Sequence, residues 1–151
     1  MKVTEIRSYR RGDLAKIPGR DDFTALLAEN PFDCGEPDRD SSFSLIGENG
    51  CPKACGGFVR ERTGVYMLWG YCSPSLTRRD WLLIAAQVRD ILAHLFRTGA
   101  HRVHSLAAAD NAAAVKYLMH IGLGTDMNRL VAYGPQGEDY ILLAAIRELG
   151  V

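Results

Sequence analysis

Histidine and cysteine are the residue types in this chain that could most readily bind a metal or carry a proton. Cys51 and Cys55 lie in the stretch CPKAC, a spacing looser than the C-x-x-C of most zinc and redox sites. His101 and His104 lie in a predicted strand, where residues three apart face opposite sides, so they are poorly placed to share one ion. The spacing favours small buried cysteines over a metal site. His104 could act as a base near neutral pH; the other interpretation is a hydrogen-bonded strand histidine.

The stretch DNAAAVKYLMHIG, residues 110–122, combines a polar start with an Ala-rich helical pattern. Asp110 is expected to cap the start of this helix, and Gly122 to follow it as the C′ residue. Asn111 also lies at the start, and its side-chain amide can both donate and accept hydrogen bonds. The residues by themselves favour Asn111 as a helix-start residue.

The elements that must position these residues begin with a strand and two helical segments. KVTEIRSY alternates and predicts the strand, RGDLAKI predicts a helical segment with Asp13 as its N-cap, and DDFTALLAEN predicts a helix. A loop rich in Pro, Gly and Asp follows. SFSLIGEN, ACGGFVRER and VYMLWGYC then predict three strands joined by the turns ENG and RTG, which indicates a hairpin meander.

The second half of the chain predicts helices alternating with strands. The longest helix lies in SPSLTRRDWLLIAAQVRDILAHLFRTG, with a broad apolar face made of Trp81, Leu82, Ile84, Ala85, Val88, Ile91, Leu92 and Leu95. HRVHSLAA, MNRLVAY and YILLAAIRE predict strands, the last two around the turn GPQGED. The predicted order is β-α-α-β-β-β-α-β-α-β-β. It indicates an α/β (mixed α+β) protein whose central sheet is mixed, mostly antiparallel, and covered by helices on both faces.

Length and composition indicate one globular domain, residues 1–151. A chain with 47% hydrophobic and 24% charged residues can bury a core of its own without metal or disulfide. The formal net charge of zero leaves no electrostatic footprint for nucleic acid, and no apolar run approaches the ~20 residues of a membrane span. The charged start MKVTEIRSYRRGD has no apolar core of signal-peptide length, so a cytoplasmic location is expected.

The order of elements and the residues of the last helix resemble the Gcn5-related N-acetyltransferase (GNAT) family. That family favours Asn at the helix head, Ala three residues later, an apolar or aromatic residue at six, and Gly-Phe at eleven and twelve. This chain has Asn111, Ala114, Tyr117, Gly122 and Leu123 at those places and departs only at the last. IRSYRRGDL also looks like the family's opening strand and first helix start, so the resemblance covers nearly the whole chain.

The resemblance implies an acyl-CoA N-acyltransferase that moves an acetyl group from acetyl-CoA to a primary amine of a small molecule or a protein. In the family, strands four and five hold the pantetheine arm of acetyl-CoA, which here would be residues 65–72 and 101–107. The cofactor contacts implied for this chain are Tyr71, Cys72, Ser73, Arg78, Arg79 and Asn111.

The chain departs from the family where a Gly-x-Gly or Gly-x-Ala loop after strand four wraps the pyrophosphate. SPSLTRRDWLLIA stands there, and the glycine positions fall on Asp80 and Leu82. An acidic and a bulky side chain disfavour an anion site, which needs close backbone approach at a helix N-terminus. Arg78 and Arg79 could compensate in part by pairing with phosphate; the other interpretation is a solvated helix face.

The residues for proton transfer also differ from the family pattern. VYMLWGYC contains no carboxylate to serve as a base, and Glu61 is expected at a turn in solvent. The family's acid, a Tyr seven residues after the helix Asn, is replaced by Leu118. Tyr117 is adjacent but about 100° round the helix. His104 and Tyr117 are therefore the candidate catalytic residues, and no metal is expected.

A second interpretation is a non-catalytic GNAT-fold protein with a structural or interaction role. The long helix without a glycine loop is also similar to the small GNAT-like internal virion proteins of T7-type phages, which would place the chain in a virion. The edge of the predicted strand YILLAAIRE could pair with a second copy or another assembly partner. No nucleic-acid or membrane partner is expected under either interpretation.

Overall fold

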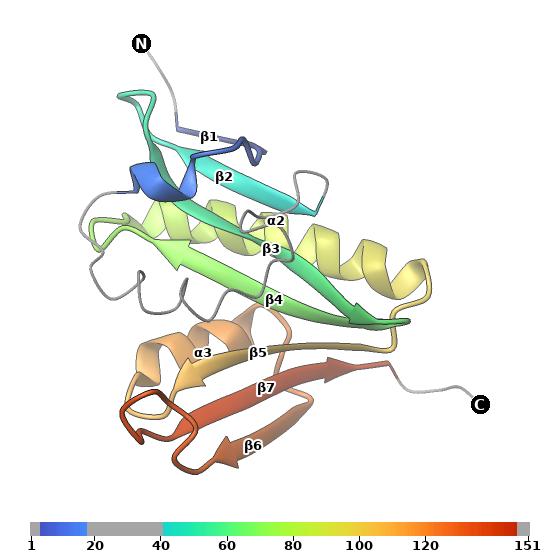
Figure 1. Ribbon diagram of the computed structural model, residues 1–151. Coiled ribbons are helices and arrows are strands. Elements are labelled where there is room, and N and C mark those ends of the chain that lie inside the picture. Colours follow the sequence, from blue (N-terminus) through green and yellow to red (C-terminus); the bar gives the residue numbers. More distant parts are fainter. Residues whose placement is uncertain (1–3, 18–40, 148–151) are drawn as a thin grey trace. The chain divides into compact units, whose positions relative to one another are not determined.

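The computed structural model describes residues 4–17 and 41–147 (Figure 1). Its elements in chain order are β1 (Glu5–Ser8), the 3-10 helix η1 (Leu14–Lys16), β2 (Ser42–Ile46), β3 (Pro52–Arg62), β4 (Val65–Cys72), α2 (Arg78–Arg97), β5 (Arg102–Ala108), α3 (Ala112–His120), β6 (Asp126–Leu130) and β7 (Tyr140–Ile146). The helix predicted from DDFTALLAEN and most of the loop after it, including Cys34, lie outside the described residues. Neither described α-helix combines the length and apolar character required to cross a membrane.

The strands form one seven-stranded sheet in the order β1-β2-β3-β4-β5-β7-β6. β1 with β2, β2 with β3, β5 with β7, and β6 with β7 pair antiparallel, whereas β4 pairs with β5 in parallel. The predicted mixed, mostly antiparallel sheet is confirmed. β7 lies between β5 and β6, so the last two strands do not follow each other along the sheet in chain order (Figure 1).

The chain divides into two compact units. Unit 1 is Met1–Val59 with Trp69–Ala85, and unit 2 is Arg60–Leu68 with Ala86–Val151. The chain therefore crosses from one unit to the other within β3, β4 and α2. The expected single domain over residues 1–151 stays a prediction.

Unit 1 has an apolar cluster in which β3 and β4 meet the segment after β1. Its buried members are Tyr9, Leu14, Ile17, Cys55 and Tyr71, with Trp69 packed against them. β2 is buried at all five of its residues, as expected for a strand covered on both faces. The buried position of Cys55 agrees with the sequence prediction, but Cys51 is exposed, because it lies in the turn between β2 and β3.

In unit 2, β5 shows the period of two that marks a strand with one buried face. Val103, Ser105 and Ala107 are buried, and the residues between them are half-buried. Three consecutive residues of β7 are buried: Leu143, Ala144 and Ala145. Gly122 follows α3 with a φ of +113°, a left-handed conformation that suits glycine, so the predicted C′ residue is confirmed.

The buried stripe of α2 includes a charged residue. Asp80, Ile84, Val88 and Leu92 recur every four residues and are all buried. Leu82 lies about 200° around the helix from Asp80 and is 54% exposed. Trp81, in the first turn, is 36% exposed. The prediction that Trp81 and Leu82 belong to the buried face of the helix was wrong. It did not include Asp80 among the buried residues.

Candidate functional site

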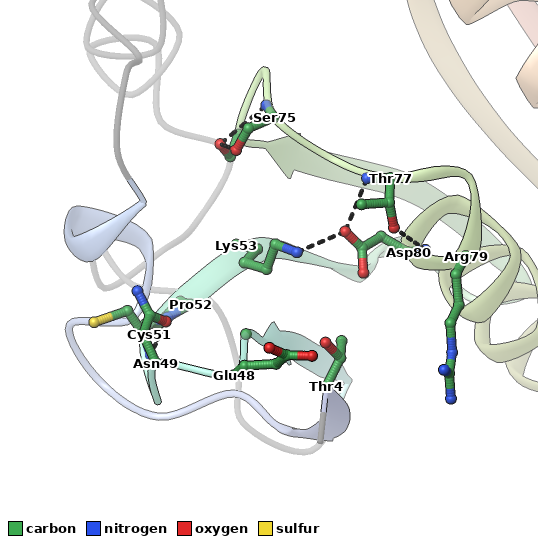
Figure 2. A pocket seen from close by; sticks show the side chains of 12 residues that line it. Thr4, Glu48, Asn49, Cys51, Pro52, Lys53, Ser75, Thr77, Arg79 and Asp80 are labelled. Carbon is green, nitrogen blue, oxygen red and sulfur yellow. Dashed lines mark hydrogen bonds and ion pairs between the residues drawn. The ribbon is translucent and has the colours of Figure 1, made fainter. Parts of the chain in front are cut away.

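A polar pocket of about 540 Å³ lies in unit 1 at the start of α2 (Figure 2). Its wall is made by Thr4, by the turn from Gly47 to Lys53, and by residues between Ser73 and Asp80. The turn and the segment before α2 are close because the N–H of Ser73 donates to the carbonyl of Lys53 over 2.8 Å. This hydrogen bond places the β3 side chain of Lys53 beside the helix start.

An ion pair between Lys53 and Asp80 occupies the pocket (Figure 2). The ammonium Nζ lies 2.7 Å from Oδ2, and the two side chains are 26% and 3% exposed. The N–H of Thr77 also donates to Oδ2 over 2.9 Å, and the N–H of Asp80 donates to the Thr77 hydroxyl over 3.2 Å. This reciprocal arrangement is a capping box with Asp in the place of Glu.

The carboxyl of Asp80 is charged. Burial alone would raise its pKa, but the hydrogen bonds from Lys53 and Thr77 outweigh burial, so its pKa lies below the ordinary value. The two arginines beside it are exposed. Arg79 borders the pocket, and in Figure 2 its side chain extends away from the ion pair.

The three residues predicted at the end of strand four have different surroundings. Tyr71 is 2% exposed and belongs to the unit 1 core. Cys72 is half-buried. Ser73 is buried, and its hydroxyl lies 2.9 Å from that of Ser75. Their roles as cofactor contacts stay predictions, as do those of Arg78 and Arg79.

In unit 2, His104 joins two strands through both of its ring nitrogens. Nε2 lies 2.9 Å from Oε1 of Glu61 on β3, and Nδ1 accepts the Nε–H of Arg102 over 3.1 Å. Because Arg102 can only donate, Nδ1 is the unprotonated nitrogen, and the proton sits on Nε2 and points at Glu61. The guanidinium of Arg102 also lies 3.9 Å from Asp126.

Glu61 lies on β3 and not at the expected turn; it is exposed, as expected, and its side chain, 35% exposed, contacts His104. The hydrogen bond from Arg102 also affects His104 as a base, because it occupies the lone pair on Nδ1 of His104. This hydrogen bond must break before Nδ1 can take a proton. The pair was missed because the two residues are 43 positions apart.

The start of α3 is capped by Asn111 and not by Asp110. The Oδ1 of Asn111 accepts the N–H of Ala114 over 3.1 Å, and its side chain is exposed. The helix starts one residue later than predicted, which moves the N-cap position from Asp110 to Asn111. Tyr117 is half-buried on the same helix. Contact of either residue with a cofactor or substrate stays a prediction.

A buried polar network in unit 1 includes Asp13, which was predicted as an N-cap. No cap bond forms. Instead the carboxylate accepts two hydrogen bonds from Arg7, at 2.7 and 3.1 Å, and one from Ser44 at 2.7 Å. The hydroxyl of Ser44 lies 3.3 Å from the thiol of Cys55, whose pKa burial raises to about 12. Such a thiol is a poor nucleophile, so this network supports the fold.

Within residues 4–17 and 41–147, no group of three His, Cys, Asp or Glu side chains is placed to hold a metal ion. The polar clusters described above are an ion pair, a histidine–carboxylate pair and a buried arginine–aspartate network. Their chemistry is that of charge pairing and proton transfer.

Comparison with known proteins finds relatives by structure only. No protein-family model and no curated protein sequence matches the chain. Ribosomal-protein-S18-alanine N-acetyltransferase from Escherichia coli is 19% identical over 99% of this chain and 97% of its own, with a TM-score of 0.67. Ard1 from Thermoplasma volcanium is 12% identical over 95% and 97%, with a TM-score of 0.69. A GNAT-family acetyltransferase from Bacillus anthracis is 14% identical over 96% and 95%, with a TM-score of 0.65. The chain therefore has the fold of the GNAT acetyltransferases.

Proposed function

We propose that this chain is a GNAT-fold N-acyltransferase that moves an acetyl group from an acetyl thioester, with acetyl-CoA as the expected donor, to a primary amine. One observation carries the proposal: acetyltransferases of this fold align with 95–99% of the chain at TM-scores of 0.65–0.69. The acceptor is expected to be an amine of a protein or a small molecule. A cytoplasmic location and a homodimer remain part of the expectation from sequence.

The reaction requires two proton transfers. The amine nitrogen forms a bond to the carbonyl carbon, the C–S bond breaks, the amine loses a proton and the leaving sulfur gains one. In unit 2, Glu61 is the acceptor of the Glu61–His104 pair and is partly open to solvent. We assign proton uptake to Glu61, with His104 as the residue that positions it. This revises the role of His104 as the direct base. Tyr117 remains the candidate acid.

Acetyl-CoA fits the chain only in part. Its diphosphate requires positive charge and accessible N–H groups at a helix start. The start of α2 instead holds the buried carboxylate of Asp80. The diphosphate does not fit there. The pantetheine arm carries amides that could pair with groups such as the Asn111 side chain.

Thermal melting with and without millimolar acetyl-CoA, followed by calorimetric titration, tests binding. Ligand at 100 times its Kd adds about 2.7 kcal/mol. For a domain of this size, that corresponds to roughly 5–11 °C in Tm. A shift of this order supports the proposal and leads to a screen of primary amines. Absence of both a shift and a titration heat with any acetyl thioester would refute it.

Once an acceptor is found, Glu61→Gln tests the base. The amide keeps an oxygen for the Nε2–H of His104 but cannot take a proton. We expect kcat to fall about 10²-fold with KM little changed. Glu5→Gln, on the exposed side of β1, is the matched control for the loss of one carboxylate. Equal loss in both variants would remove Glu61 from the mechanism.

A non-catalytic GNAT-fold interaction protein is the second candidate, including the predicted virion-associated form. The engaged lone pair of His104 and the carboxylate at the start of α2 favour it. A chain that binds no acetyl thioester, yet is recovered in a defined complex, would support this candidate.

A further inference from the structure

The carboxylate of Asp80 places a negative charge at the start of α2. Asp80 is 2% exposed, and its Oδ2 receives the ammonium of Lys53 at 2.7 Å and the N–H of Thr77 at 2.9 Å. These are the partners that a phosphate oxygen would need at a helix N-terminus: a cation and a main-chain donor. The carboxylate therefore fills the role of a bound anion from within the chain.

Two further main-chain N–H groups near this position are engaged as well. The N–H of Asp80 bonds to the Thr77 hydroxyl, and the N–H of Trp81 bonds to the Thr77 carbonyl. No glycine lies between Tyr71 and Arg97 to let a ligand approach the main chain. A diphosphate arriving here would have to displace a hydrogen-bonded carboxylate of the same charge sign.

Lys53 shows that this arrangement depends on the tertiary structure. It comes from β3, 27 residues before Asp80, and its side chain is still 26% exposed. An ammonium group has three donors, and the carboxylate uses one of them. If Asp80 lost its charge, Lys53 would be left as an unneutralised cation beside the pocket.

We propose that, because of Asp80, this chain recognises its acyl donor by the pantetheine arm and not by the nucleotide diphosphate. The inference rests on the proposed function and names the donor class: acyl thioesters of pantetheine, with or without a nucleotide attached. Asp80 is then a specificity-determining residue, which excludes phosphate from the start of α2.

The unmodified protein supplies the first test, by calorimetric titration with acetyl-CoA and with acetyl-pantetheine, which lacks the nucleotide. The two Kd values are expected to agree within about 3-fold. A preference of 30-fold or more for acetyl-CoA would overturn the inference, because the nucleotide would then contribute most of the selectivity.

Asp80→Asn supplies the second test. The amide keeps the shape and an oxygen for the Thr77 N–H, but removes the charge and releases Lys53. Acetyl-CoA is expected to bind at least 10-fold tighter to this variant, acetyl-pantetheine equally well, and inorganic pyrophosphate only to the variant. Asp90→Asn, an exposed position on the same helix, controls for net charge and is expected to change none of these.

The outcomes separate the two proposals. Pyrophosphate binding to the unmodified protein at the affinity of the variant would overturn the role of Asp80. If no thioester binds but the variant gains pyrophosphate, the acyltransferase function fails and the exclusion by Asp80 stands. If Asp80→Asn does not fold, the comparison of the two thioesters on the unmodified protein still decides donor selectivity.

Discussion

The dual role predicted for Asn111 can be separated by three substitutions at one position. Its Oδ1 accepts the N–H of Ala114 over 3.1 Å at the start of a nine-residue helix, and the side chain is exposed. Asn111→Ala removes the cap, for which about 1 kcal/mol is expected. In a chain of this size, that lowers Tm by about 2–4 °C. If the amide also donates to the pantetheine arm, the same change removes about 1 kcal/mol of binding, roughly 5-fold in Kd.

Asn111→Asp distinguishes the two roles, because a carboxylate can accept the cap bond but cannot donate to a ligand carbonyl. A negative charge at a helix start is also favourable by about 0.3–1 kcal/mol. The Asp variant is therefore expected to keep or raise Tm while losing acetyl-thioester affinity. Asn111→Ser, which caps and also donates, should stay close to the original protein in both measurements.

The assays are thermal unfolding by circular dichroism and calorimetric titration with acetyl-CoA and acetyl-pantetheine. If the Asp variant binds as tightly as the original chain, Asn111 is a cap only and its place among cofactor contacts is lost. If the Ala variant melts at the unchanged temperature, the hydrogen bond from the Ala114 N–H to Asn111 contributes nothing to stability, and Asn111 is not a stabilising cap either.

Three further predictions concern the two units. Hydrogen bonds lower the pKa of Asp13 against the effect of burial, so its stabilisation is present above the ordinary value of 3.8 and is lost as pH falls through the lower folded value. Asp13→Asn should lower the free energy of unfolding by about 2–3 kcal/mol at pH 7, and urea titrations should show this difference shrinking in acid. Gly64→Ala should destabilise by about 1–3 kcal/mol, since φ is +76° and a Cβ would collide with the imidazole of His101; an unchanged urea midpoint would contradict this. Cys51 is exposed and should react with a thiol reagent in the native protein, whereas Cys55, with a pKa raised to about 12, should react only after unfolding, as located by mass spectrometry.

The bounds of individual helices and strands could be predicted because their sequence signals lie within a few consecutive residues. The bounds of β4 match the predicted stretch VYMLWGYC at both ends. The positive φ of Gly122 follows from its place after an Ala-rich helix. The error at the start of α3 was one residue, because Asp and Asn are equally good caps and only the main-chain path selects between them.

The polar clusters of the candidate site depend on contacts between distant segments. From the sequence, Asp80 indicated only that a glycine of the loop is replaced. Folding supplies Lys53 from β3, and this pairing makes a buried carboxylate stable and turns the start of α2 into a filled anion position.

What the sequence by itself determined was the type and order of the described elements, since residue periodicity, turn glycines and caps act over a few positions. Only the tertiary structure decided which polar side chains meet: Glu61 with His104, and Lys53 with Asp80. It also decided that β7 lies between β5 and β6. The physical reason is that strand register and side-chain ion pairs depend on which segments the sheet brings together, and that choice is made by packing across the whole chain.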